Sequence, residues 1–341
     1  MKLNNSAVKN KSIVLVIPLH FELYKDLILS LQKAGLDVIF LFITDKPFKY
    51  RDFAEHFKSF VYKNFLGQKN FKKQLIFHHE NENLISQLDK IEQRVDYALI
   101  IRSDLLSVDT LMHIKSKVDK MIAYQWDGLN RFPSVFDRIS IFDKFYVFDH
   151  NDYQNYSPAY DNLLLTTNFY LEVPKTENVV VRPKSICFVG SYLENRMPYI
   201  QELTDFLKQE NFEIDIKLLC SQDKVAEMYE DSGIEFISNP LTYSEMLRHV
   251  QRYEVILDFD NSVIHQGLSF RIFEALFYNK KIITNNALVK KYDFYHPNNV
   301  FIWESENLHR LGLFLNEPMV NIDLKIIEKY SFNNWIKKIL A

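Results

Sequence analysis

Residues 254–286 constrain the fold of this chain more than any other segment. Residues 255–259 form a short apolar run with β-branched members, which predicts a buried strand. Apolar residues then recur at close to helical spacing over 268–278, and a second apolar run begins at 281–284. Strand, loop, helix and strand make a βαβ unit with parallel strands. The loop before the helix therefore lies at the carboxyl end of a strand, where open α/β sheets bind ligands.

The same alternation fills both halves of the chain. Further strands are predicted at 12–17, 38–43, 97–101, 120–124, 144–148, 163–165, 185–189, 214–219, 234–237 and 300–303. Further helices are predicted at 24–34, 198–209, 224–231, 243–250 and 332–340, and 50–94 is mostly helical and charged. The pattern predicts an α/β chain with two Rossmann-like, doubly wound domains, 1–175 and 184–325. Residues 172–183 contain two prolines and little periodicity, which indicates an interdomain linker.

Composition excludes several function classes. The 341 residues carry a net charge of −3 with a pI near 6.4, which argues against a general nucleic-acid binder. Only seven glycines occur, and neither a Walker A pattern nor a dinucleotide fingerprint is present. Side chains and helix termini must therefore hold any nucleotide. We interpret the 28 Phe and 19 Tyr residues as core filling, with a stacking platform for an acceptor as the alternative.

The cysteines and the amino-terminal region favour a cytoplasmic protein. Cys187 and Cys220 lie in apolar, strand-like runs without disulfide or zinc spacing, which fits a reducing compartment. The apolar run 13–19 contains Pro18 and is followed by His20, unlike a signal peptide. No stretch approaches the roughly 18 uninterrupted apolar residues of a membrane span.

The loop and first turn of the featured unit combine groups that suit a sugar nucleotide. Four side chains there donate hydrogen bonds to phosphate: His265, Gln266, Ser269 and Arg271. A helix N-terminus adds to their affinity for anions, and Glu274, one turn further, can accept from hydroxyls. The alternative is helix capping combined with an Arg271–Glu274 surface pair.

Two other loops of the second half are candidates for contacts to the same ligand. Gly190 ends the first strand and permits close approach of a backbone, and Ser191 and Arg196 follow at a helix start. Residues 239–243, which end at Tyr243, follow a strand and form a candidate cradle for the base.

The featured segment resembles the donor-binding element of GT-B glycosyltransferases, especially bacterial enzymes that build lipopolysaccharide, capsule or O-antigen. Residues 273–283, FEALFYNKKII, match a segment of the type EAMACGLPVI. A closer likeness is to bacterial transferases with a Gln-Gly-Leu-Ser/Thr-x-Arg-x-x-Glu stretch, matched here by Gln266, Gly267, Leu268, Ser269, Arg271 and Glu274. Many retaining members carry a glutamate where this chain has Gln266, so retaining chemistry does not transfer directly.

The resemblance implies a GT-B fold in which two Rossmann-like domains face a cleft and the terminal segment 326–341 packs back on the first domain. It also implies that Glu274 binds the ribose hydroxyls and Arg271 the diphosphate of a nucleoside-diphosphate sugar. We expect that co-substrate, with no other cofactor and no metal, and a saccharide or glycolipid acceptor in the first domain. The pair Asp258 and Asp260 resembles a metal-binding motif of GT-A enzymes, which is the weaker interpretation.

An inverting transferase needs a base that deprotonates the acceptor hydroxyl. In GT-B enzymes that base comes from the first domain, and three strand ends offer candidates there: His20, Asp104 and Asp127. Each also suits an ordinary role as a helix cap or loop residue.

Basic residues raise the question of a peripheral contact with the inner membrane. Residues 69–73 are a basic stretch, and Trp335, Lys337 and Lys338 lie on the last helix. Solvated loops and helix faces are the alternative.

For the whole chain, the alternatives to a transferase are a GT-B-like sugar-nucleotide epimerase and a catalytically silent sugar-nucleotide-binding protein.

Overall fold

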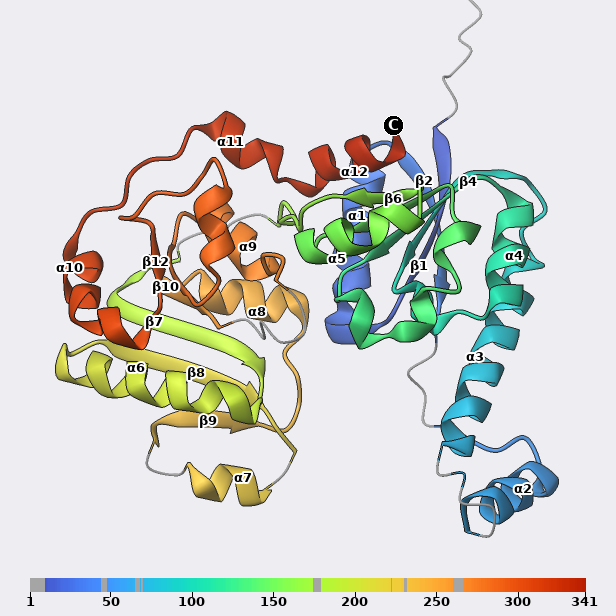
Figure 1. Cartoon of the computed structure of the whole chain (residues 1–341), viewed down its shortest axis with the longest axis horizontal. Helices are drawn as coiled ribbons and strands as arrows, with labels where there is room; N and C mark the ends of the chain where they lie inside the picture. The colour runs from blue at the N-terminus through green and yellow to red at the C-terminus, as the bar shows by residue number, and fades with distance from the viewer. Residues whose placement is uncertain are drawn as a thin grey trace, which may run out of the picture.

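The computed structural model describes residues 10–43, 48–64, 68, 70–173, 179–221, 223–229, 232–259 and 266–341. Within them, two six-stranded parallel sheets form two lobes that lie side by side (Figure 1). Helices surround each sheet, as the βα alternation of the sequence predicts. The predicted α/β fold of two doubly wound domains is therefore confirmed.

The first sheet has the order β2-β1-β3-β4-β5-β6. Its strands are β1 (Lys11–Ile17), β2 (Leu36–Phe42), β3 (Val95–Ile101), β4 (Val118–Gln125), β5 (Lys144–Val147) and β6 (Leu163–Leu165). Its helices are α1 (Leu23–Lys33), α2 (Phe53–Asn64), α3 (Phe71–Leu88), α4 (Val108–Lys117) and α5 (His150–Tyr156).

The second sheet has the order β12-β11-β10-β7-β8-β9. Its strands are β7 (Arg182–Ser191), β8 (Glu213–Leu219), β9 (Ile234–Ile237), β10 (Tyr253–Asp258), β11 (Lys281–Thr284) and β12 (Val300–Ile302). The helices that follow β7 are α6 (Met197–Gln209), α7 (Asp223–Met228), α8 (Tyr243–Val250), α9 (Phe270–Tyr278), α10 (Leu311–Asn316), α11 (Leu324–Lys329) and α12 (Phe332–Leu340).

Alternate residues of the strands enter different cores. In β1, Ile13 and Leu15 belong to the core that includes α1 and α12, whereas Val14 and Val16 belong to the core that includes α3 and α4. The second sheet is sandwiched in the same way, with α8 and α9 on one face and α6 and α10 on the other. Strands buried on both faces explain why the sequence shows continuous apolar runs rather than alternation.

The strand order places a topological switch point in each sheet. In the second sheet, β7 is followed along the chain by β8 on one side, and β10 pairs with β7 on the other side. The carboxyl ends of β7 and β10 therefore flank the crevice where such sheets bind ligands. In the first sheet the corresponding point lies between β1 and β3.

The chain returns to the first domain at its end. Ile326 and Ile327 of α11 still pack against the second domain, and Ser331 then pairs with Tyr170 in a parallel bridge. α12 packs into the core of the first domain, where Trp335 Nε1 donates to the carbonyl oxygen of Thr167 at 3.0 Å. This confirms the return that the resemblance implies. Since Trp335 is buried, its interpretation as a lipid contact is wrong.

The bounds of most predicted elements differ from the observed ones by one to three residues at an end. α9 begins at Phe270 rather than 268 because Ser269 has the extended backbone of an N-cap. β7 begins at Arg182, inside the predicted linker, and 174–178 of that linker lie outside the described residues. Among the helices of the described ranges, none has the length and apolar content that crossing a bilayer requires.

Candidate functional site

Arg271, in the first turn of α9, lies against the carboxyl ends of β7 and β10. Its Nη1 is 3.2 Å from Oδ1 of Asp258, and its Nη2 donates to the carbonyl oxygen of Val189 at 3.1 Å. The guanidinium also lies 4.9 Å from the ring centroid of Phe188, and the side chain is 26% exposed. Because a guanidinium has five N–H donors in a planar fork, this arrangement leaves donors for an anion at the strand ends.

Asp258 organises this cluster, and the sequence analysis did not assign it that role. Its carboxylate is 1% exposed and accepts from Ser269 Oγ at 2.6 Å and Thr284 Oγ1 at 3.3 Å, besides pairing with Arg271. A buried carboxylate requires such partners. Asp260, the other member of the acidic motif, lies outside the described residues. In the described part of the chain, no group of three or more His, Cys, Asp or Glu side chains is placed to hold a metal ion.

The start of α9 is not capped by its own N-cap side chain. The Ser269 side chain makes no cap hydrogen bond, and its hydroxyl donates to Asp258 instead. The backbone N–H of Ile272 donates to the carbonyl oxygen of Ser269 at 3.3 Å, and the helix dipole favours an anion at the N–H groups that precede it. Ser269 and Arg271 lie together at the switch point through Asp258, and their contact with a phosphate stays a prediction.

Gly190 permits Arg271 to lie close to β7. A Cβ at Gly190 would stand 3.0 Å from the Phe188 ring and 3.3 Å from Nη2 of Arg271. Ser191, exposed, ends β7, and the partly buried Arg196 immediately precedes α6. Ser191 thus closes the strand that supports Arg271 and Arg196 follows it, but their contact with a ligand stays a prediction.

Glu274 does not pair with Arg271 on the surface, so the alternative interpretation of these two residues is wrong. Glu274 is 3% exposed, and its Oε1 accepts from Tyr243 Oη at 2.8 Å. Burial raises the pKa of Glu274 to about 7, against the opposing effects of Tyr243 and Arg271. The structure thus joins two predicted donor-binding residues, and their contact with a ribose stays a prediction.

The segment that leads into α9 contacts the first domain. The backbone N–H of Gln266 donates to Oδ2 of Asp149 at 2.6 Å, and the carbonyl oxygen of Leu268 accepts from Asn168 Nδ2 at 2.8 Å. Gly267 is in such close contact with Phe148 that an added Cβ would lie 2.8 Å from the carbonyl oxygen of that residue. The predicted motif therefore lies between the two sheets. His265, its remaining member, lies outside the described residues.

Asp104 and Asp127 lie together at the carboxyl ends of β3 and β4. Arg102 binds both oxygens of Asp104 at 2.7 Å and lies 3.1 Å from Oδ2 of Asp127. Asp127 also accepts from Arg131 at 2.6 Å. Arg102 has a left-handed backbone (φ 68°) and stacks on the ring of Phe132 at 3.9 Å. Both carboxylates are therefore neutralised by arginine in this conformation, and their role as a base stays a prediction.

Ring contacts join the two clusters. Trp126, next to Asp127, packs edge-on against Phe270, next to Arg271, with ring centroids 6.3 Å apart. His20 stands elsewhere, exposed at the carboxyl end of β1, and is followed by Phe21 with a left-handed backbone.

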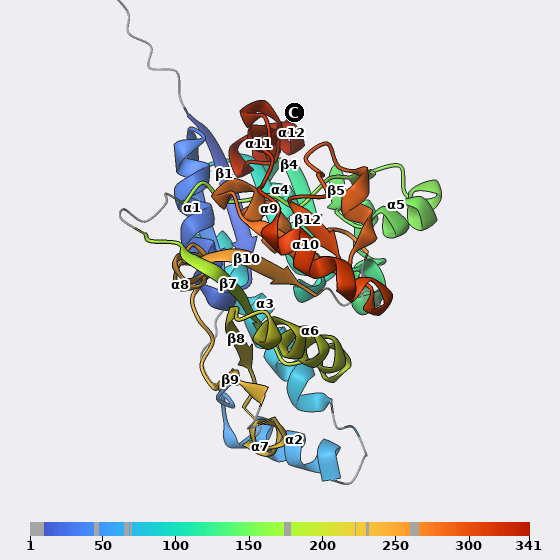
Figure 2. The same cartoon turned by 90° about the vertical axis from the view of Figure 1, so that its left-hand side faces the viewer.

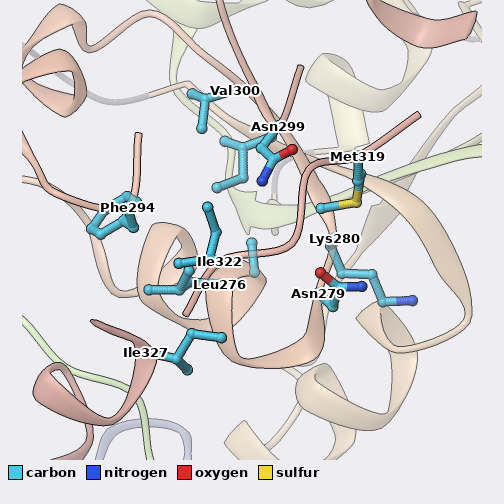
Figure 3. Close-up of a pocket in the computed structure, with 11 residues that line it drawn as sticks. Leu276, Asn279, Lys280, Phe294, Asn299, Val300, Met319, Ile322 and Ile327 are labelled. Carbon is cyan, nitrogen blue, oxygen red and sulfur yellow. The ribbon is translucent and has the colours of Figure 1, made fainter. Parts of the chain in front are cut away.

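Two pockets differ in their capacity for a ligand. One, of about 400 Å³, lies at the carboxyl ends of β7, β8 and β9 and is lined by Tyr192, Leu219, Cys220, Ser221, Ser238 and Pro240. Pro240 belongs to the segment predicted to cradle the base, and the volume falls in the usual range of ligand sites. The other, between α9, β11 and the chain before α11, encloses about 20 Å³ (Figure 3). It accommodates about one water molecule rather than a sugar nucleotide.

No protein-family model matches the chain, and no curated protein sequence matches it. Among solved structures it is similar to a UDP-forming α,α-trehalose-phosphate synthase from Burkholderia xenovorans, with a TM-score of 0.63, 9% identity and 98% of each chain covered. It is also similar to AviGT4, a glycosyltransferase involved in avilamycin A biosynthesis (TM-score 0.56, 10% identity, 96% of this chain and 97% of that chain). A third structure, described as a UDP-N-acetylglucosamine 2-epimerase from Listeria monocytogenes, has a TM-score of 0.55 at 12% identity and covers 97% of this chain and 95% of that chain. At such low identity the likeness shows a shared fold, and the predicted GT-B fold is confirmed.

Proposed function

We propose that this chain is a glycosyltransferase that moves a sugar from a nucleoside-diphosphate sugar to a saccharide acceptor. The observation that carries the proposal is the position of Arg271 at the β7/β10 switch point, held by buried Asp258 beside an uncapped helix N-terminus. This is an arrangement for a diphosphate, the leaving group of such a transfer. Similar folds in a trehalose-phosphate synthase and in AviGT4 support the reaction class.

The pocket of about 400 Å³ extends the anion site along the same edge of the second sheet. Its lining includes Tyr192, which directly follows β7, and Arg271 contacts Val189 near the end of the same strand. The pocket and Arg271 therefore share the end of β7. We assign the base of the donor to this pocket and its diphosphate to Arg271, the start of α9 and Arg196. The acceptor then approaches from the first domain, where Asp104, Asp127 and His20 follow the strand ends.

The biological setting is part of the proposal. On the sequence resemblance, we place the chain in the bacterial cytoplasm, in the assembly of lipopolysaccharide, capsule or O-antigen. The acceptor is lipid-linked, and the protein contacts the inner membrane peripherally. Arginine side chains and helix N-termini stabilise the negative charge of the donor diphosphate, without a metal ion.

The test is product analysis after incubation with UDP, GDP, CMP and dTDP sugars and an extract of bacterial membranes. We expect one donor to give a glycosylated lipid product and a free nucleotide in equal amounts. Arg271→Ala is expected to raise the donor KM and to lower kcat by orders of magnitude. Unchanged kinetics in that variant would remove Arg271 from the site.

An epimerase is the second candidate, because the Listeria structure described as an epimerase shares the fold at a similar TM-score. The same incubation without acceptor separates the two activities, since an epimerase yields an isomerised sugar from the donor alone. Nucleotide binding with neither product would instead identify a catalytically silent sugar-nucleotide-binding protein.

A further inference from the structure

Helix α2 presents its apolar face to solvent. Phe53, Phe57 and Phe60 recur at intervals of four and three residues and are 80%, 57% and 54% exposed. Such spacing places the three rings on one side of the helix. A surface helix of a globular domain normally turns this side toward the core.

The polar face of α2 is the one that contacts the protein. Ser59 is 6% exposed, and its Oγ forms a hydrogen bond of 3.0 Å with Oη of Tyr50. Oε1 of Glu55 is 2.7 Å from Nε2 of His79 on α3, and Tyr62 stacks on Phe71 at 4.2 Å. His56 of α2 also packs against Tyr50, with ring centroids 4.7 Å apart. Hydrogen bonds and ring contacts thus hold α2 in this orientation, with the aromatic stripe outward.

The surroundings of the stripe are basic although the chain as a whole is acidic. The described residues between 48 and 73 carry six basic side chains, namely Lys49, Arg51, Lys58, Lys63, Lys72 and Lys73, and two carboxylates, a net charge of +4. Both carboxylates are engaged within the protein, because Asp52 accepts from the backbone N–H of Glu55 and Glu55 pairs with His79. Of the basic side chains, Arg51 pairs with Glu82 of α3, and the five lysines supply the remaining positive charge. The net charge of the whole chain is −3. The positive charge is therefore a local property of this region.

We propose that α2 docks on an anionic lipid bilayer, with the three phenylalanine rings in the headgroup boundary and the lysines against the headgroups. An exposed aromatic face beside lysines on one helix is the chemistry of interfacial binding. A second copy of this chain does not fit as well, because a two-fold dimer through α2 would oppose two lysine-rich, positively charged surfaces. This inference rests on the proposed function and specifies which surface makes its membrane contact. The docking itself requires no nucleotide.

The position of α2 connects docking to the candidate site. α2 stands at the end of α3, away from the first sheet, in both views (Figure 1 and Figure 2). Along the chain it follows the carboxyl end of β2, and in a parallel sheet this edge also carries Asp104 and Asp127. Docking through α2 therefore directs the acceptor side of the first domain toward the lipid.

The test is co-sedimentation of the full chain with vesicles of phosphatidylglycerol and phosphatidylethanolamine, compared with vesicles of phosphatidylcholine. We expect binding to the anionic vesicles that weakens with salt. Combined Phe53→Ser, Phe57→Ser and Phe60→Ser substitutions are expected to lower the partition coefficient by about tenfold or more. Lys58→Glu with Lys63→Glu is expected to act in the same direction. All five positions are exposed, and circular dichroism checks that the variants remain folded.

Matched controls make the result specific. Leu313 and Leu324, which are 71% and 73% exposed elsewhere on the chain, are replaced together by Ser and are expected to leave sedimentation unchanged. Arg271→Ala should also sediment like the wild type, so that failure of the donor site is distinguishable from failure of docking. Absence of wild-type binding, or equal binding by the triple Phe variant, would overturn the proposal. So would a wild-type dimer that the triple variant abolishes.

Discussion

The carboxylate of Asp258 positions Arg271, and a ligand can bind to the guanidinium without displacing this carboxylate. Asp258 is buried below the strand ends and satisfied by Ser269, Thr284 and one edge of the guanidinium. A fixed guanidinium loses little conformational freedom on binding, and its remaining donors form a planar fork suited to phosphate. The anion therefore meets a preorganised charge at this site.

Gly190→Ala tests how closely Arg271 must lie against β7. The added methyl group would stand 3.3 Å from Nη2 and 3.0 Å from the Phe188 ring, so the guanidinium must shift by a few tenths of an ångström. We expect the donor KM to rise by about tenfold, because small misplacements of a binding group are costly. Gly312→Ala is the control, since a Cβ there meets only Phe206 at 3.9 Å within helix α10. The control should keep its KM, and equal KM values for both variants would contradict the account.

Glu274→Gln tests the buried carboxyl. Burial raises the pKa of Glu274 from 4.5 to about 7, so folding favours the protonated form. Its contribution to stability is fully present below pH 4.5 and is lost as pH rises through 7. Between about pH 4.5 and pH 8, the wild type should lose about 3 kcal/mol of its free energy of unfolding in urea beyond any loss that the variant shows over the same range. Other groups titrate alike in both proteins, so parallel pH profiles would disprove the assignment.

At the scale of elements, continuous apolar runs bounded by polar residues were sufficient to predict most strands and helices. β6, β9, β11, α8 and α12 have the predicted bounds. The capping residues Thr242 and Ser331 explain the sharp helix starts, since each accepts a hydrogen bond from the first turn. Local chemistry fixes these elements, and local chemistry is visible in sequence.

Long-range contacts explain what the sequence did not reveal. The partners of Asp258 come from β11 and α9 and converge only when β10 and β11 pair. Helix α2 shows a second limit. Periodicity locates an aromatic stripe at Phe53, Phe57 and Phe60, but it does not tell which way the stripe faces, and interpretation of all Phe residues as core filling is wrong for these three.

Gly267→Ala tests the contact between the loop before α9 and Phe148, the residue that follows β5. A Cβ at Gly267 would lie 2.6 Å from Cε2 of Phe148 and 2.8 Å from its carbonyl oxygen, and a backbone atom cannot move aside alone. We expect a loss of about 1–3 kcal/mol in the free energy of unfolding, together with weaker donor binding because the start of α9 must shift. Wild-type stability in this variant would show that the loop does not pack on the first domain as described.

At the scale of the whole molecule, α12 ties the end of the chain to the first domain. The ring of Trp335 packs against Tyr124, Phe169 and Phe332 and donates to the carbonyl oxygen of Thr167. The chain crosses from one sheet to the other just before this point, near Ser331. The helix therefore limits how far the two lobes can separate.

Trp335→Ala removes this packing. We expect a loss of about 3–5 kcal/mol in the free energy of unfolding, the cost of truncating a buried aromatic side chain. Trp335→Phe keeps most of the apolar contact and loses the hydrogen bond, so its cost should be closer to about 1 kcal/mol. Urea unfolding measures both, and similar small losses in the two variants would indicate that α12 is not packed in the core.

The central claim is a diphosphate site at the β7/β10 switch point, and isothermal titration calorimetry with UDP, GDP, CDP and dTDP tests it most directly. We expect the wild type to bind at least one of these nucleotides. Arg271→Ala should weaken that binding by about 1.5–3 kcal/mol, the worth of a charge-assisted hydrogen bond. Arg94→Ala, which removes an exposed arginine paired with Asp119, should not affect it. Equal affinity of the Arg271→Ala variant and the wild type would contradict the account.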